Sequence, residues 1–151
     1  MISVETPAGL LDVVGQDATA EGWFPVEQAR IDAFANTTDD HQWIHVDPVR
    51  AAGGPFGATV AHGYLTLSLI PSLTDGLVVV GGTGLVVNYG LDRVRFLQPV
   101  TAGSRIRARS TVTSAEPTPQ GVRATFTVMV EIEGATKPAL IAETVVLYFA
   151  A

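Results

Sequence analysis

The sequence has no cysteine and few charged residues. Without cysteine, a disulfide framework, thiolate metal sites and a cysteine nucleophile are excluded. Only 16% of the residues are charged, yet no uninterrupted apolar stretch reaches the roughly 18 residues of a membrane span. No basic segment followed by an apolar run opens the chain. We therefore expect a cytoplasmic protein without a membrane partner, whose chemistry depends on Asp, Glu, His, Ser, Thr and Tyr.

Basic residues are also few, and they are unevenly distributed. The net charge of −6 argues against a general affinity for nucleic acid. Residues 1–92 hold 11 acidic and 2 basic side chains (11 − 2, a charge of −9), whereas residues 93–151 hold 4 acidic and 7 basic ones, a charge of +3. The arginines of the second part (Arg93, Arg95, Arg105, Arg107 and Arg109) could meet an anionic ligand or form the solvated face of a sheet.

Apolar residues make up 47% of the 151 residues, which is enough for one domain over residues 1–151. The first half predicts helices. These are a short helix at Ala8–Val14, one over Val26–Ala35 with Pro25 in its first turn, one that begins at Asp47-Pro48, and one over Tyr64–Leu73. The last is apolar around its axis, so we expect it to be buried on most sides and ended or kinked by Pro71.

The second half alternates apolar and polar residues with the period of a strand. Predicted strands cover Leu85–Asn88, Arg93–Leu97, Ser104–Ser114, Val122–Ile132 and Ala139–Phe149, with turns at 117–121 and 133–137. The last strand is apolar on both faces, as in a central strand or one covered by a subunit. Helices followed by antiparallel strands indicate the α+β class.

Possible chemistry concentrates between Asp39 and Pro48, a segment predicted to be irregular. It holds three carboxylates and two of the three histidines. Asp40 and His45 are five positions apart, and a carboxylate with an imidazole can hold one water and move its proton, which suits hydration or hydrolysis. Alternatively, Asp39 or Asp40 caps a turn and His45 bonds to backbone.

A metal site is a second interpretation of this segment. His41, His45 and Asp47 offer nitrogen and oxygen ligands, and helical spacing would place the two histidines on one face. The Trp-Ile-His-Val-Asp-Pro sequence is more typical of irregular chain, and no other ligand set follows. We expect no metal.

The third histidine, His62, precedes Gly63 at a predicted helix start. The unpaired backbone N–H groups there could bind an oxyanion or a polarised carbonyl. Ser68, further along the helix, could line a pocket and bond the aspartate, or bond its own i−4 carbonyl. Tyr64 is a candidate for the apolar wall of that pocket.

Asp40-His-Gln-Trp-Ile-His45-Val-Asp-Pro48, followed by Ala61-His-Gly-Tyr-Leu65, resembles the MaoC-like dehydratases, the (R)-specific enoyl-CoA hydratases. Their motif runs Asp, four residues, His, one residue, Asp-Pro, with a later His-Gly at the start of the central helix. The resemblance covers roughly residues 20–150. Many members have Asn-Pro inside the motif, where this chain has Gln42-Trp43, as in a subgroup related to nodulation N-type proteins.

The resemblance implies a hot dog fold, in which an antiparallel sheet wraps a long central helix, and a homodimer with joined sheets. It also implies that Asp40 and His45 hold a water above the double bond of a trans-2-enoyl-CoA. The Gly63 N–H would bind the thioester oxygen, and the product would be an (R)-3-hydroxyacyl-CoA, formed without a cofactor. An acyl-CoA thioesterase and a non-catalytic acyl-binding partner subunit remain alternatives.

Overall fold

A curved antiparallel sheet forms most of the molecule in the computed structural model, which describes residues 1–151. Its strands follow the order β2-β6-β7-β8-β5, and β3 also pairs with β6. The long strands are β5 (Thr83–Phe96), β6 (Ser104–Thr118), β7 (Gly121–Ile132) and β8 (Leu140–Ala150), and the short ones are β2 (Asp17–Thr19) and β3 (Phe24–Val26).

Strands β6 and β7 form because apolar residues alternate along both. Ile106, Ala108, Ser110 and Val112 of β6 are buried, as predicted, and the arginines between them face outward. The register pairs Ile106 with Ile132 and Ala108 with Val130, so both inward sets meet on one face. The central place predicted for the last strand is confirmed, since β8 lies between β7 and β5.

Strand β5 joins the two strands predicted at Leu85–Asn88 and Arg93–Leu97. It pairs with β8 along its length, with register shifts at Asn88/Gly90 and Leu91/Arg93. A β-bulge breaks the alternation of side chains, and this explains why the sequence pattern is interrupted between the predicted strands. Because β5 is the last strand of the sheet, large apolar side chains such as Leu85, Tyr89 and Phe96 stay exposed.

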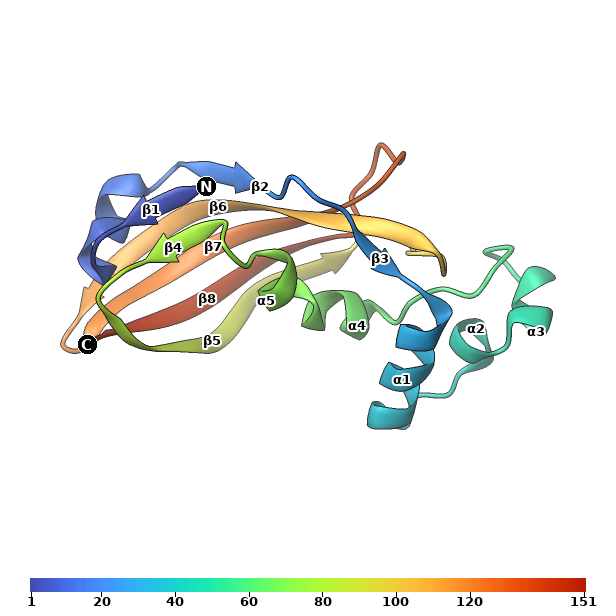
Figure 1. Cartoon of the computed structure of the whole chain (residues 1–151). Helices are drawn as coiled ribbons and strands as arrows, with labels where there is room; N and C mark the ends of the chain where they lie inside the picture. The colour runs from blue at the N-terminus through green and yellow to red at the C-terminus, as the bar shows by residue number, and fades with distance from the viewer.

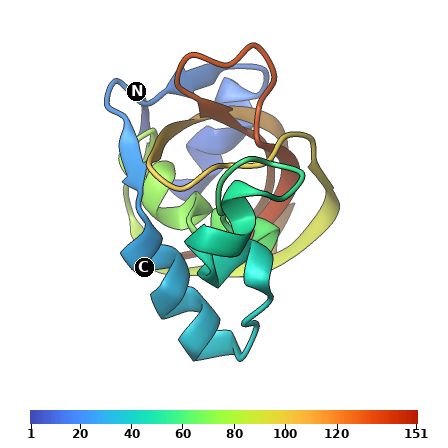
Figure 2. The same cartoon turned by 90° about the vertical axis from the view of Figure 1, so that its right-hand side faces the viewer.

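The central helix runs as two consecutive segments, α4 (Gly63–Ser68) and α5 (Ile70–Leu73), inside the curve of the sheet (Figures 1 and 2). Leu69 separates them, and Pro71, which has no N–H to donate, stands in the first turn of α5. The interruption predicted at Pro71 is thus confirmed. Leu65, Leu69, Ile70 and Leu73 are buried in the core. Tyr64 is 70% exposed, so the expectation of burial on most sides is wrong there.

Three further helices lie beyond one end of the sheet (Figure 1): α1 (Gln28–Thr38), α2 (Trp43–Val46) and α3 (Pro48–Ala52). Pro25 does not start a helix as predicted; it belongs to β3, opposite Arg105 of β6. A proline is tolerated on an edge strand because its missing N–H costs no ladder bond there. The predicted start at Asp47-Pro48 is confirmed, since Asp47 Oδ1 accepts the Arg50 N–H at 3.0 Å.

The half of the sheet away from these helices carries both termini (Figure 1). There, β1 (Ile2–Val4) pairs in parallel with β4 (Val78–Val80), and the short helix predicted near residue 8 is a 3-10 helix, η1 (Pro7–Val13). Twenty-five buried apolar residues form one core, to which β1, η1, α1, α4, α5 and the strands β6, β7 and β8 contribute, among others. No helix is long and apolar enough to cross a membrane.

Gly121 begins β7 where the backbone of β8 passes closely. A Cβ at this position would overlap the carbonyl oxygen of Tyr148, and the φ of 158° lies in a region that side chains disfavour. We expect Gly121→Ala to lower the free energy of unfolding by about 2–4 kcal/mol, because backbone rather than a side chain must move. Urea unfolding measures the change. Gly22→Ala is the control, because the space around its Cβ is open, and its free energy of unfolding should stay within about 0.5 kcal/mol of the wild type. Equal effects of the two substitutions would contradict the close backbone approach at Gly121.

Candidate active site

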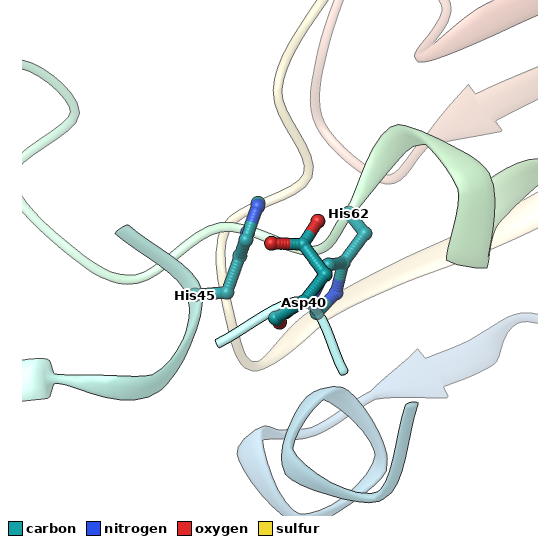
Figure 3. Close-up of side chains that lie close together, drawn as sticks. All are labelled: Asp40, His45 and His62. Carbon is teal, nitrogen blue, oxygen red and sulfur yellow. The ribbon is translucent and has the colours of Figure 1, made fainter. Parts of the chain in front are cut away.

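Asp40, His45 and His62 come together from three parts of the chain. Asp40 follows α1, His45 lies in α2, and His62 directly precedes α4. One nitrogen or oxygen atom from each lies within 4.8 Å of the others. Figure 3 shows the three side chains gathered in one place, with the Asp40 carboxylate close to the two imidazole rings. The sequence segments predicted to carry chemistry thus meet in one place.

A short extended segment, residues 59–61, holds the site against the sheet. On one side, Ala61 N bonds to Val100 O at 2.8 Å, and Ala102 N bonds to Thr59 O at 2.9 Å. On the other side, Val60 N bonds to Ile44 O of α2 at 2.9 Å. The same residues therefore connect α2 with the chain that enters β6.

Asp40 owes its place to the way α1 ends. Asp39 adopts a left-handed conformation with φ of 60° and terminates the helix. Aspartate and asparagine tolerate this conformation better than most residues. Asp40 then lies exposed at the surface, and its Oδ1 accepts only a long hydrogen bond, 3.4 Å, from the Gln42 N–H. Most of the oxygen lone pairs of this carboxylate are free for a ligand.

His45 is buried, with 7% of its surface exposed. Its Nδ1–H donates to the Val60 carbonyl at 2.6 Å, so Nε2 carries the free lone pair of the neutral ring. Burial is the main cause that lowers the pKa of His45 below its usual 6.5, and the charge interaction with His62 also lowers it. The Val60 bond and Asp40 act in the opposite direction. His45 is therefore a neutral acceptor at neutral pH.

His62 is more deeply buried, with 2% exposed. Its Nε2–H donates to the backbone carbonyl of Asp40 at 3.0 Å, and no group bonds its Nδ1. Its ring stacks on His45 with 3.8 Å between the centroids and contacts Phe34 at 4.9 Å. A backbone group therefore satisfies one of its two ring nitrogens, and the other has no partner.

Gly63 opens α4, and no group in the protein accepts its N–H. A Cβ here would meet the Phe96 ring at 3.0 Å, so glycine allows the close approach of β5. Tyr64 points outward and lies edge-on to Phe96, with 6.3 Å between ring centroids. Ser68 donates to the Tyr64 carbonyl at 2.7 Å and does not bond Asp40. For Ser68 the i−4 alternative is correct.

Two cavities flank α4. One of about 250 Å³ is lined by Gly63, Thr66 and Phe96, among others. A larger cavity of about 760 Å³ lies between the helix segments and the sheet, and its wall includes Leu67, Ser68, Pro71, Val86, Phe126 and Tyr148. Ser68 lines the larger cavity as predicted, whereas Tyr64 does not. Burial raises the pKa of Tyr148 to about 12, so its hydroxyl stays protonated.

Comparison with known proteins shows the family to which this chain belongs. Residues 11–133 match the MaoC like domain. This chain is a member of the MaoC-like dehydratase family. It is 46% identical to 3-hydroxyacyl-thioester dehydratase Z of Mycobacterium tuberculosis H37Rv, over 99% of this chain and all of that protein. It is 43% identical to nodulation protein N of Rhizobium leguminosarum bv. viciae, over 89% of this chain and 85% of that one.

Among solved structures, the (R)-hydratase from A. caviae involved in PHA biosynthesis superimposes with a TM-score of 0.73 at 29% identity. The alignment covers 88% of this chain and 94% of that one. The hot dog fold implied by the motif is therefore confirmed for this MaoC-like chain, as is its resemblance to the nodulation N proteins.

The candidate metal ligands His41, His45 and Asp47 of this MaoC-like chain do not come together. His41 is exposed and bonds Asn36 at 3.0 Å, and Asp47 caps α3. Asp40, His45 and His62 are close enough for a metal, but the two rings stack 23° from parallel. A metal lies in the plane of each imidazole that binds it, and stacked planes do not converge on one point. The geometry of the three residues does not favour a metal site.

The arginines proposed for an anionic ligand are partly engaged. Arg105, Arg107 and Arg109 pair with Glu133, Glu131 and Asp17 at 2.6–3.0 Å on the outer face of β6. For these three the alternative, a solvated face of the sheet, is correct. Arg93 and Arg95 of β5 form no ion pair.

Gln28 is a site residue that the sequence did not reveal. Its amide nitrogen donates to the His45 carbonyl at 2.7 Å and to Asp32 at 2.8 Å, and its oxygen accepts from the buried Thr59 hydroxyl. It thus joins α1 to α2 and to residues 59–61. A glutamine in the first turn of a helix carries no sequence signal for this role.

The lowered pKa of His45 predicts a pH dependence of stability. Between the folded-state pKa and 6.5, the unfolded chain binds a proton that the folded chain does not. The stability that the neutral form of His45 contributes is fully present above 6.5, the pKa in the unfolded chain. It is lost as the pH falls from 6.5 through the lower pKa of the folded protein. We expect His45→Gln to show a shallower loss of unfolding free energy than the wild type between about pH 7.5 and about pH 5 in urea titrations. Identical slopes would contradict this prediction.

Proposed function

We propose that this chain catalyses the (R)-specific hydration of a trans-2-enoyl-CoA to an (R)-3-hydroxyacyl-CoA and the reverse dehydration, as a hydro-lyase. The observation that carries the proposal is the pairing of an exposed carboxylate, Asp40, with the free Nε2 of a buried and neutral His45. The names of the relatives, a thioester dehydratase and an (R)-hydratase, support the same class of reaction.

The reaction needs one water held in place and one proton moved. Asp40 and His45 would bind the water between the carboxylate oxygens and Nε2. The water oxygen forms the new bond to C3 as one of its O–H bonds breaks and the pair takes that proton. The pair delivers a proton to C2, where the electrons of the double bond form the new C–H bond. One water is consumed, and no atom is left over. Because His45 is neutral and the carboxylate is charged, the pair can accept the water proton and then pass a proton on.

Negative charge develops on the thioester oxygen during this addition, and the Gly63 N–H is the donor we assign to it. No protein group competes for this N–H. Removal of such a donor typically costs about 3–4 kcal/mol of barrier. The His62 side chain, almost completely covered, would not touch the substrate itself. Tyr64, exposed beside Phe96, would border the entrance, and the cavity that Ser68 lines would take the acyl chain.

The loss of absorbance of crotonyl-CoA tests this proposal. We expect hydration by the wild type, and a decrease of about a hundredfold or more in Asp40→Asn and in His45→Gln, the scale of lost acid–base catalysis. Asp39→Asn and His41→Gln are matched controls, because both residues are exposed and asparagine tolerates the left-handed conformation at position 39. Both controls should keep the wild-type rate within a few-fold.

Two results would redirect the proposal. Release of free thiol without hydration would indicate the thioesterase alternative. A wild type inert on crotonyl-CoA and on a longer enoyl-CoA would favour the non-catalytic acyl-binding subunit, which needs another chain for activity.

We also propose that two copies of the chain join along β5 to form a homodimer. This edge strand exposes Leu85, Val86, Tyr89 and Leu91, an apolar set that a second sheet would cover. Sedimentation should give a mass of twice the 15.9 kDa of one chain. Leu85→Lys should shift the protein toward the monomer, whereas a change at the exposed Val49, far from β5 in the sequence, should not. A wild-type monomer at micromolar concentration would exclude this assembly.

A further inference from the structure

His62 contacts both members of the proposed catalytic pair, although the chemistry assigned above does not use it. Its Nε2–H donates to the Asp40 backbone, and its ring covers one face of His45. We propose that His62 is a positioning residue that fixes Asp40 through this hydrogen bond and His45 through this stack. The inference rests on the proposed function and adds to it a third residue, which acts through the other two.

The hydrogen bond matters because little else holds Asp40. Its side chain is exposed and accepts one long bond at 3.4 Å, so no side-chain packing determines where the carboxylate lies. Asp39 before it is in the left-handed conformation. The bond from His62 at 3.0 Å therefore anchors the backbone from which the carboxylate projects. Without this anchor, the carboxylate can move relative to His45 Nε2.

The stack matters because the hydrogen bond of His45 to Val60 leaves its ring free to tilt about the bond direction. The His62 ring, which packs against Phe34, blocks this tilt on one face of the His45 ring. Burial of both rings makes the contact rigid, since only 7% of His45 and 2% of His62 are exposed.

The role of His62 can be measured through the pKa of His45, because few charged groups surround that ring. Asp40 and His62 are the titratable groups whose charge acts on it. From α1 the neutral Gln28 reaches its carbonyl, and from α3 Arg50 is turned over the Trp43 ring at 4.3 Å. Because the charge interaction with His62 lowers the pKa of His45, replacement of His62 by a neutral side chain should raise it.

Two substitutions distinguish the effect of the His62 hydrogen bond from the effect of its ring stack. His62→Gln places an amide N–H near the position of Nε2 and removes the ring, whereas His62→Phe keeps a ring and removes the donor. We expect kcat for crotonyl-CoA to fall about a hundredfold in His62→Phe, the scale of a misplaced catalytic group, with KM within a few-fold. His62→Gln should lose less than about tenfold, because the anchor of Asp40 is kept. In both variants the acidic limb of the pH profile should move to higher pH.

His41→Gln and His41→Phe are the matched controls, since His41 is exposed one residue after Asp40 and bonds only Asn36. Both should retain the wild-type kcat and pH profile. If His62→Phe keeps kcat within twofold of the wild type, the proposal is overturned. It is also overturned if His62→Gln, folded by far-UV circular dichroism, loses as much kcat as His62→Phe.

A measurement without substrate distinguishes failure of this proposal from failure of the hydratase assignment. NMR of the ¹⁵N-histidine-labelled protein should show a slowly exchanging Nε2–H on His62 and a His45 titration below 6.5, the usual pKa. In His62→Gln the His45 titration should move upward. A His62 Nε2–H that exchanges as fast as that of His41 would exclude the bond, whether or not the protein hydrates enoyl-CoA. If the wild type shows the expected NMR spectrum but does not hydrate enoyl-CoA, only the hydratase proposal is rejected.

Discussion

The double pairing of residues 59–61 is the constraint on which the site depends. This segment bonds α2 on one side and residues 100–102 on the other, and its Val60 carbonyl also accepts the Nδ1–H of His45. One short piece of extended backbone thus locates α2, selects the tautomer of His45 and leads directly into His62 and Gly63. Rigid placement on the sheet, rather than strong local preferences, positions the polar groups.

The two members of the pair differ mainly in burial. Asp40 lies at the surface on the end of a helix, while His45 is enclosed by α1, residues 59–61 and a second histidine. The carboxylate stays in contact with water, whereas burial disfavours the charged form of the imidazole. The protein therefore presents a negative acceptor and a neutral one on either side of a single small space, without a network of charged side chains.

Much of this arrangement could be predicted from the sequence, because it follows local rules. Alternation in Ser104–Ser114 and Val122–Ile132 identifies buried faces, Asp47-Pro48 identifies a helix start, and the spacing from Asp40 to His45 points to a family. The features that escaped prediction depend on distant partners. Gln28 becomes a connector only because Thr59 and α2 lie beside it, and Pro25 is in a strand only because β6 pairs with it. Propensity cannot anticipate such tertiary contacts.

Both termini lie on the half of the sheet away from helices α1–α3 (Figure 1). The first residue is 85% exposed, and the last follows β8 out of the sheet. An affinity tag, a fluorescent protein or a surface linker can therefore be attached at either terminus while the Asp40–His45 side of the molecule faces the solution. The fold itself provides an orientation for immobilisation, with the site directed away from the support.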